Sequence, residues 1–216
     1  MTRARLSGAR LYVCTDARSA RGDLADFLDA ILLAGVDIVQ MRDKSLSEAD
    51  ELRALAVVKD RCEKHGALWV VNDRVHLALE TGAPIVHVGQ GDMPVTHVRE
   101  LLGAEVIIGQ STHSRAQAEL AASNPDVDYF ALGPIWETPT KPGRPAIGLH
   151  VVSDFAEDQA SQAKPWFAIG GINAENITEV RGAGATRVVV VRAVTEASNP
   201  AAAAQALRAA VAVGVA

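Results

Sequence analysis

The sequence predicts an α/β protein that folds as a single (β/α)8 TIM barrel. Short apolar runs recur along its 216 residues, and turn residues and a helix-like segment follow them. This alternation is typical of parallel α/β proteins, and eight such units match a barrel better than an open sheet. An open flavodoxin-like or Rossmann-like sheet is the alternative. The first strand lacks the G-x-G-x-x-G turn that the dinucleotide-binding version of that sheet requires.

Eight runs rich in β-branched residues are predicted as the strands. Their near-continuous apolarity is typical of parallel strands that are buried on both faces. They cover residues 10–16, 37–44, 68–74, 84–92, 105–112, 128–134, 166–171 and 186–193.

Segments with apolar residues at helical spacing lie between these runs, and several of them close on a glycine. The predicted helices cover residues 47–66, 74–82, 96–103, 114–122, 173–184 and 200–214, with the weakest pattern within 148–163. No proline- or serine-rich linker divides the chain. We therefore expect one domain over residues 1–216, with a short flexible N-terminus over residues 1–9.

Composition narrows the class of protein. The net charge of −5 gives no sign of a nucleic-acid partner, although it still allows a small anionic ligand. No apolar run approaches the roughly 18 residues of a membrane span, and the N-terminus lacks the apolar segment of a secretory signal. Cys14 and Cys62 lie on separate predicted elements, which favours reduced thiols in a cytoplasmic protein. Whether the chain forms a homo-oligomer is left open.

The stretch "QMRDK" ends the second predicted strand with a basic pair. Chemistry in a barrel lies at the carboxyl ends of the strands. Gln40, Arg42 and Lys44 alternate, so their side chains share one face if the strand continues through them. Such a group suits an anionic or phosphorylated ligand. The alternative is an inward-facing arginine that pairs with a nearby acid.

Two carboxylates follow neighbouring strands. Asp73 ends the third strand and Asp92 follows the fourth. Adjacent strands lie about 4.8 Å apart, so both carboxylates could reach one cation. Two carboxylates with water and a substrate phosphate are a common magnesium site. The alternative is that each aspartate caps the helix that follows it.

Two further segments suit a phosphorylated ligand. Gly170 and Gly171 end the seventh strand before a helix, where backbone N–H groups can bind an anion, although a plain turn explains them equally well. The proline-rich loop 137–146 carries Lys141 on a stiff backbone. We expect this loop to close over the site and to exclude water.

Several motifs together resemble one family. "VQMRDK", "VNDRVHLALETGAPIVHVGQGDMP", "IIGQSTHS", "DYFALGPIWETPTKPGRPAIGL" and "WFAIGGINAENITEV" resemble the thiamine-phosphate synthase (thiamine-phosphate pyrophosphorylase) family, in order and at successive strand ends. The resemblance implies a (β/α)8 barrel that needs Mg2+. It implies a transferase that joins hydroxymethylpyrimidine diphosphate to a thiazole phosphate, or to its carboxylated form, and releases pyrophosphate.

The resemblance also implies roles for individual residues, by their position in these motifs. Arg42, Lys44, Ser111 and Lys141 are the implied catalytic residues, and Arg192 departs from the serine that the family often has. The implied magnesium ligands are Asp73 and Asp92. The implied contacts to the pyrimidine diphosphate are Gln40, Arg42, Lys44, Asn72, Ser111 and Lys141. The implied contacts to the thiazole phosphate are Thr138, Thr140, Gly170, Gly171, Val191 and Arg192.

Other functions are weaker predictions. A related thiazole tautomerase shares the barrel but uses acid–base chemistry without a metal, and the acidic pair favours the synthase. A sugar-phosphate isomerase needs a positioned acid and base, for which the sequence offers no clear pair. Ser111 and His113 lack the nucleophile elbow and the orienting third group of a hydrolase. A non-catalytic binder of phosphorylated ligands is the alternative from another class.

Overall fold

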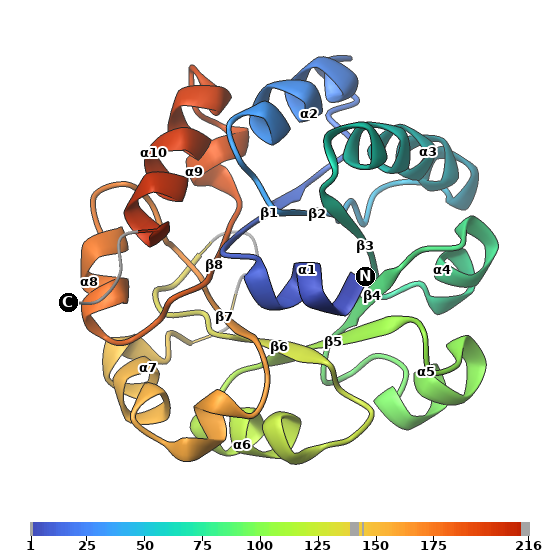
Figure 1. The fold of residues 1–216 in the computed structure, drawn as a ribbon. Helices are drawn as coiled ribbons and strands as arrows, with labels where there is room; N and C mark the ends of the chain where they lie inside the picture. The colour runs from blue at the N-terminus through green and yellow to red at the C-terminus, as the bar shows by residue number, and fades with distance from the viewer. Residues whose placement is uncertain (1, 139–142, 144, 213–216) are drawn as a thin grey trace.

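The computed structural model describes residues 2–138, 143 and 145–212, and it confirms the predicted barrel. Eight parallel strands pair in sequence order and close into a ring, and helices surround it (Figure 1). The strands are β1 Leu11–Thr15, β2 Ile38–Met41, β3 Leu68–Asn72, β4 Ile85–Val88, β5 Ile107–Thr112, β6 Tyr129–Leu132, β7 Trp166–Ile169 and β8 Val188–Val190.

All eight predicted strands are present, but each is shorter than its apolar run. In β2 the ladder pairs Gln40 with Cys14 of β1 and Met41 with Thr15, and then the strand ends. The N–H of Arg42 still donates to the carbonyl of Thr15, at 2.8 Å. Lys44 lies in the turn beyond, so strand alternation alone does not position its side chain.

The helices cover the outside of the barrel, and the predicted ones are all present (Figure 1). They are α3 Glu48–His65, α4 Val75–Thr81, α5 Val95–Leu102, α6 Arg115–Ser123, α7 Gly148–Ala156 with η1 Gln159–Gln162, α8 Ile177–Gly182 and α10 Pro200–Ala212. The structure adds helices that the sequence analysis did not delimit. These are α1 Thr2–Gly8, α2 Leu24–Leu33 and α9 Arg192–Thr195.

Helix α1 replaces most of the predicted flexible N-terminus. It lies across the centre of the ring in Figure 1, next to the start of β1, so it covers the amino end of the barrel. Leu6 is 3% exposed and packs into the barrel interior with Tyr12 and Phe167. Burial of this leucine is the physical reason for an ordered helix here. The opposite, carboxyl end is left for the site.

Alternate strand residues face two different cores. Val13, Val39 and Val71 belong to the layer between the strands and the outer helices. The neighbouring positions on the same strands belong to the interior, which contains Tyr12 and Val70. Towards the carboxyl end, the inward positions become polar. They are Gln40, Asn72, His87 and Ser111.

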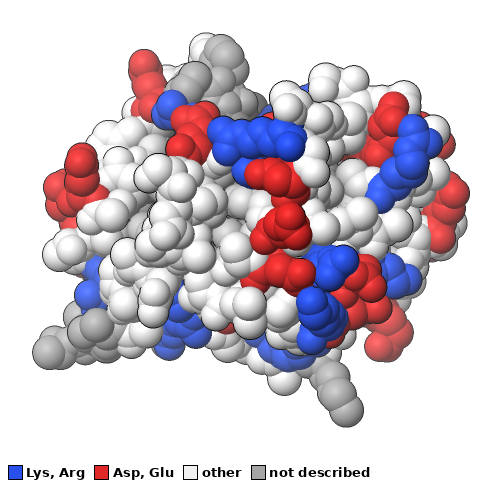
Figure 2. All heavy atoms as spheres, turned by 90° about the horizontal axis from the view of Figure 1, so that it is seen from above, with Lys and Arg blue, Asp and Glu red and all other residues white. Residues whose placement is uncertain are grey.

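The surface carries both signs of charge. The face drawn in Figure 2 has lysine, arginine and acidic side chains interspersed in a central band, without a large area of one sign. Within the described part of the chain, no helix is long and apolar enough to cross a membrane.

Candidate active site at the carboxyl end of the barrel

Two carboxyl groups meet at the carboxyl ends of β3 and β4. Asp73 follows β3 directly, and Asp92 lies in the turn after β4. The two carboxyl groups lie within hydrogen-bonding reach of each other. Burial, and then the adjacent Asp92, raise the pKa of Asp73, while Lys44 opposes this shift. Like charges brought together in this way create a site that favours a cation.

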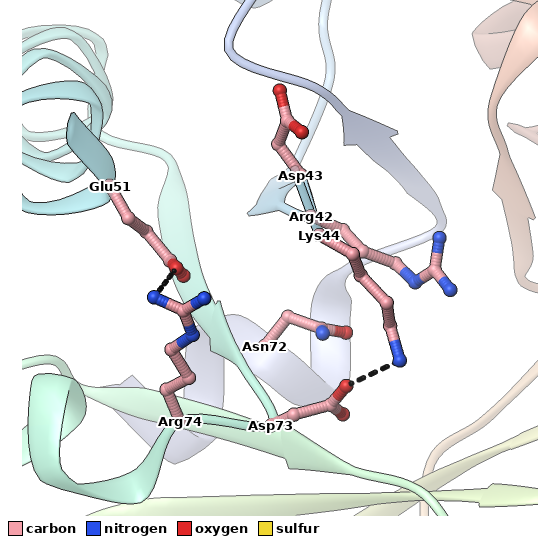
Figure 3. Close-up of a pocket in the computed structure, with 7 residues that line it drawn as sticks. All are labelled: Arg42, Asp43, Lys44, Glu51, Asn72, Asp73 and Arg74. Atoms are coloured by element: carbon pink, nitrogen blue, oxygen red, sulfur yellow. Dashed lines mark ion pairs between the residues drawn. The ribbon is translucent and has the colours of Figure 1, made fainter. Parts of the chain in front are cut away.

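Neither aspartate caps a helix, as the alternative required. The residue before α4 is Arg74, and the residue before α5 is Pro94, and neither helix start has a side-chain cap. Asp92 instead accepts the N–H of Gly89 through Oδ2 at 2.8 Å, inside its own turn. Asp73 has a φ of 58°, a left-handed conformation that is uncommon outside glycine. With this backbone, the Asp73 side chain points toward Lys44 (Figure 3).

The basic residues of the β2–α3 turn face this carboxylate pair. Lys44 Nζ lies 3.4 Å from Asp73 Oδ2, and its side chain is 66% exposed, so it can reach a ligand as well. Arg42 and Lys44 point away from Asp43, whose carboxylate accepts the hydroxyl of Ser45 at 2.6 Å (Figure 3). No acidic side chain among the described residues lies within ion-pair distance of Arg42. The alternative prediction, in which Arg42 pairs with an acidic side chain, is therefore wrong for the described residues.

A cavity of about 200 Å³ opens at this point. Arg74 Nη1 lies 2.9 Å from Glu51 Oε2, and this ion pair ties α3 to the turn that carries Asp73 (Figure 3). The Glu51 side chain is 4% exposed, and burial raises its pKa although Arg74 opposes that rise. The cavity is lined by Arg42, Asp43, Lys44, Glu51, Asn72, Asp73 and Arg74.

Hydrogen bonds from neighbouring side chains orient the amide of Asn72 and the hydroxyl of Ser111, two groups of the implied pyrimidine site. Gln40 Nε2 donates to Asn72 Oδ1 at 2.7 Å. Ser111 Oγ lies 2.9 Å from His87 Nε2, and Gln90 Nε2 donates to the Ser111 carbonyl at 2.7 Å. His87, inside β4, therefore supports a site side chain.

The implied thiazole-phosphate residues gather at the ends of β7 and β8. Gly170 and Gly171 have φ of 108° and 73°, and a Cβ at Gly170 would lie 2.5 Å from the Cα of Pro134. The close approach of β6 and β7 therefore requires glycine there. Val191 and Arg192 follow the neighbouring strand β8, and Arg192 Nη1 lies 4.0 Å from Glu196 Oε2.

The 137–146 loop is only partly described. Thr138 is half-buried at its start, downstream of Pro134, which lies against Gly170 after the end of β7. Thr140 and Lys141 lie outside the described residues, as does Arg144. Their predicted roles remain predictions.

The described residues contain no cluster of three or more histidine, cysteine or acidic side chains that could hold a metal ion. A metal at the Asp73–Asp92 pair would therefore complete its coordination with water and substrate oxygens. Magnesium commonly binds in this way.

Known proteins resemble this chain over nearly its whole length. The family model described as thiamine monophosphate synthase matches residues 11–194. A thiamine-phosphate synthase of Streptomyces avermitilis is 56% identical over 203 residues, covering 94% of each chain. One of Thermobifida fusca is 54% identical over 206 residues, covering 95% of this chain and 94% of its own.

The fold is shared as well. A solved thiamine phosphate pyrophosphorylase of Pyrococcus furiosus superposes with a TM-score of 0.84 at 30% identity, covering 98% of both chains. The barrel, the acidic pair at β3 and β4 and this likeness lead to one conclusion: the chain belongs to the thiamine-phosphate synthase family.

Proposed function

We propose that this chain is a thiamine-phosphate synthase, a transferase. It joins 4-amino-2-methyl-5-hydroxymethylpyrimidine diphosphate to 4-methyl-5-(2-hydroxyethyl)thiazole phosphate, or to the carboxylated thiazole, and releases pyrophosphate. Its family membership supports this activity. The observation that carries the proposal is the placement of Asp73 and Asp92 side by side, with Lys44 3.4 Å from Asp73.

The acidic pair fits Mg2+. Two adjacent carboxylates with a raised pKa at Asp73 are a costly arrangement without a cation, and both side chains lie at the open end of the barrel. Asp73 and Asp92 would hold the ion, which when bound would neutralise charge on the diphosphate. The low ligand count leaves positions for diphosphate oxygens and water.

Arg42 and Lys44 would bind the diphosphate from the β2–α3 turn. Both are cationic, and both reach the cavity that Asp73 also lines. As the diphosphate leaves, negative charge grows on its oxygens, and positioned cations lower the energy of that state. Lys141 would add a third cation when the 137–146 loop closes. Gln40, Asn72 and Ser111 would orient the pyrimidine end.

The thiazole phosphate would lie at the ends of β7 and β8. Backbone N–H groups at Gly170 and Gly171 would bind the phosphate, and Val191 and Arg192 lie on the neighbouring strand end. Thr138 and Thr140 would complete the site from the β6–α7 loop. Arg192 is about half-exposed and could turn from Glu196 to the phosphate.

The bond change requires no side-chain nucleophile. The C–O bond between the pyrimidine CH2 and the diphosphate breaks, and the electron-rich ring carries the positive charge. The thiazole nitrogen then forms the new C–N bond. The residues of the site have to position the two substrates, stabilise pyrophosphate and exclude water.

A coupled pyrophosphate assay tests the proposal. With both substrates and Mg2+ we expect steady pyrophosphate release, and none when either substrate or the metal is omitted. Metal-independent isomerisation of a thiazole would favour the tautomerase, and tight binding of both substrates without turnover would favour a binding protein. We expect the enzyme to act in the cytoplasm.

A further inference from the structure

A continuous chain of hydrogen bonds crosses the interior of the barrel and joins two site side chains. Its members come from six different strands. In order, they are Asn72, Gln40, Tyr12, Tyr129, His87 and Ser111. Asn72, Gln40 and Ser111 are residues that we place against the pyrimidine substrate, whereas Tyr12, Tyr129 and His87 have no role in the proposed chemistry.

The first half runs down from β3 to β1. Gln40 Nε2 donates to Asn72 Oδ1 at 2.7 Å, and Gln40 Oε1 accepts the hydroxyl of Tyr12 at 2.8 Å. The thiol of Cys14 donates to the same oxygen at 3.1 Å. Two donors converge on Oε1, which fixes the orientation of the Gln40 amide.

The second half crosses to β6 and returns to the mouth. The hydroxyls of Tyr12 and Tyr129 lie 3.3 Å apart, and Tyr129 lies 3.1 Å from His87 Nδ1. His87 Nε2 lies 2.9 Å from Ser111 Oγ. This series of hydrogen-bonded side chains fits only beside a glycine. A Cβ at Gly109 would lie 2.2 Å from Tyr129 Cζ and 2.5 Å from His87 Nδ1.

The hydroxyls of Tyr12 and Tyr129 each have one hydrogen to donate. The orientation of the Gln40 amide therefore sets the donor and the acceptor in each hydrogen bond from Tyr12 to Ser111. Tyr12 gives its hydrogen to Gln40, so it accepts from Tyr129. Tyr129 has then used its hydrogen and accepts from the Nδ1–H of His87. A neutral imidazole protonated at Nδ1 accepts at Nε2, so Ser111 donates to it. Burial raises the pKa of both tyrosines, which keeps both hydrogens in place.

We infer that Tyr12, Tyr129 and His87 are positioning residues that fix the hydrogen-bonding polarity of the pyrimidine site. Asn72 is left with its NH2 group as a donor, and Ser111 with hydroxyl lone pairs as an acceptor. This inference rests on the proposed function for its ligand. An aminopyrimidine offers both partners, a ring nitrogen that accepts and an exocyclic amine that donates.

Tyrosine-to-phenylalanine variants test the chain without removing the rings. Both tyrosines pack edge-on against Phe167, at centroid distances of 5.6 Å for Tyr12 and 5.9 Å for Tyr129, and phenylalanine preserves that packing. We expect Tyr129→Phe to lower kcat/KM for the pyrimidine diphosphate about tenfold. The KM for the thiazole phosphate should stay unchanged. Cys14→Ala removes one of the two donors to Gln40 Oε1 but leaves the Tyr12 hydroxyl in place, so we expect a smaller loss of kcat/KM than in Tyr12→Phe.

A double-mutant cycle adds a second kinetic test. Since Tyr12→Phe and Tyr129→Phe break the same bridge, the double variant should be no worse than the worse single variant. Additive losses, or an equal rise in both KM values, would mean that the tyrosines act only through barrel packing.

Nitrogen NMR of His87 gives a readout that does not depend on turnover. In the wild-type protein we expect the Nδ1–H tautomer, and in Tyr129→Phe a shift toward Nε2–H. A wild-type His87 protonated at Nε2 would overturn the inferred polarity. If the wild-type protein releases no pyrophosphate, the proposed function fails. The His87 tautomer still decides whether the hydrogen bonds from Tyr12 to Ser111 have the inferred direction.

Discussion

The ion pair between Arg74 and Glu51 offers a direct test of how the Asp73 turn is held. Arg74→Met keeps an unbranched apolar stem at this position and removes the guanidinium, whose Nη1 lies 2.9 Å from the 4%-exposed Glu51 carboxylate. Breaking a buried pair costs about 3–5 kcal/mol, because one charge is left without a partner. The Arg74 side chain is 32% exposed and admits water, so we expect the lower end, about 3 kcal/mol.

The pH dependence of this loss follows from the pKa of Glu51. Burial already raises that pKa, and loss of Arg74 removes an influence that lowers it. In the variant, the folded protein therefore keeps a proton that the unfolded chain has released. Folding stability then falls as pH rises from the ordinary glutamate pKa through the raised one. We expect the loss to be full at pH 8 and smaller at pH 5.

Urea unfolding followed by tryptophan fluorescence measures these free energies at both pH values. Glu51→Gln combined with Arg74→Met is the matched control, since it removes both charges and should recover much of the loss. A loss below about 1 kcal/mol that is equal at pH 5 and pH 8 would refute the reasoning.

Three further predictions concern the carboxylate pair, the leaving group and the thiols. Asp73→Asn should raise the melting temperature of the metal-free protein, because repulsion from Asp92 is relieved. The same substitution should abolish stabilisation by Mg2+. Scanning calorimetry with and without Mg2+ measures both effects. Lys44→Ala should slow single-turnover pyrophosphate release about a hundredfold, and an unchanged rate would remove Lys44 from the chemistry. Burial raises the pKa of Cys62 to about 12, and Cys14 is also buried, so a thiol reagent at pH 8 should label neither until urea unfolds the chain. Rapid labelling of the native protein would contradict the buried core described here.

The pattern of strands could be predicted because each strand is buried on both faces and bounded by polar residues. The apolar runs gave all eight strands in order, but not their ends. The second run continues to Lys44, whereas β2 ends at Met41, since ladder hydrogen bonds rather than composition set the end. Helix α1 could not be predicted in this way, because its one buried contact, Leu6, depends on the finished barrel.

The acidic pair could be predicted in kind but not in geometry. Sequence spacing placed Asp73 and Asp92 on neighbouring strands and left helix capping open. Only the structure shows that Asp73 adopts a left-handed φ and that Asp92 bonds within its own turn. The roles of Tyr12 and Tyr129 were missed, because inward tyrosines in a strand resemble ordinary core residues. Gly109 beside them was the available signal, since a strand glycine often marks a close approach.

We propose that Asp73 and Asp92 share one divalent cation that faces the departing diphosphate. Anomalous diffraction from crystals grown with Mn2+ and pyrophosphate tests it most directly, because manganese is located independently of the protein density. We expect one peak bonded to both carboxylates and to pyrophosphate oxygens, with Lys44 turned toward the same anion. Bound pyrophosphate with the manganese peak absent, or bonded to neither aspartate, would contradict the account.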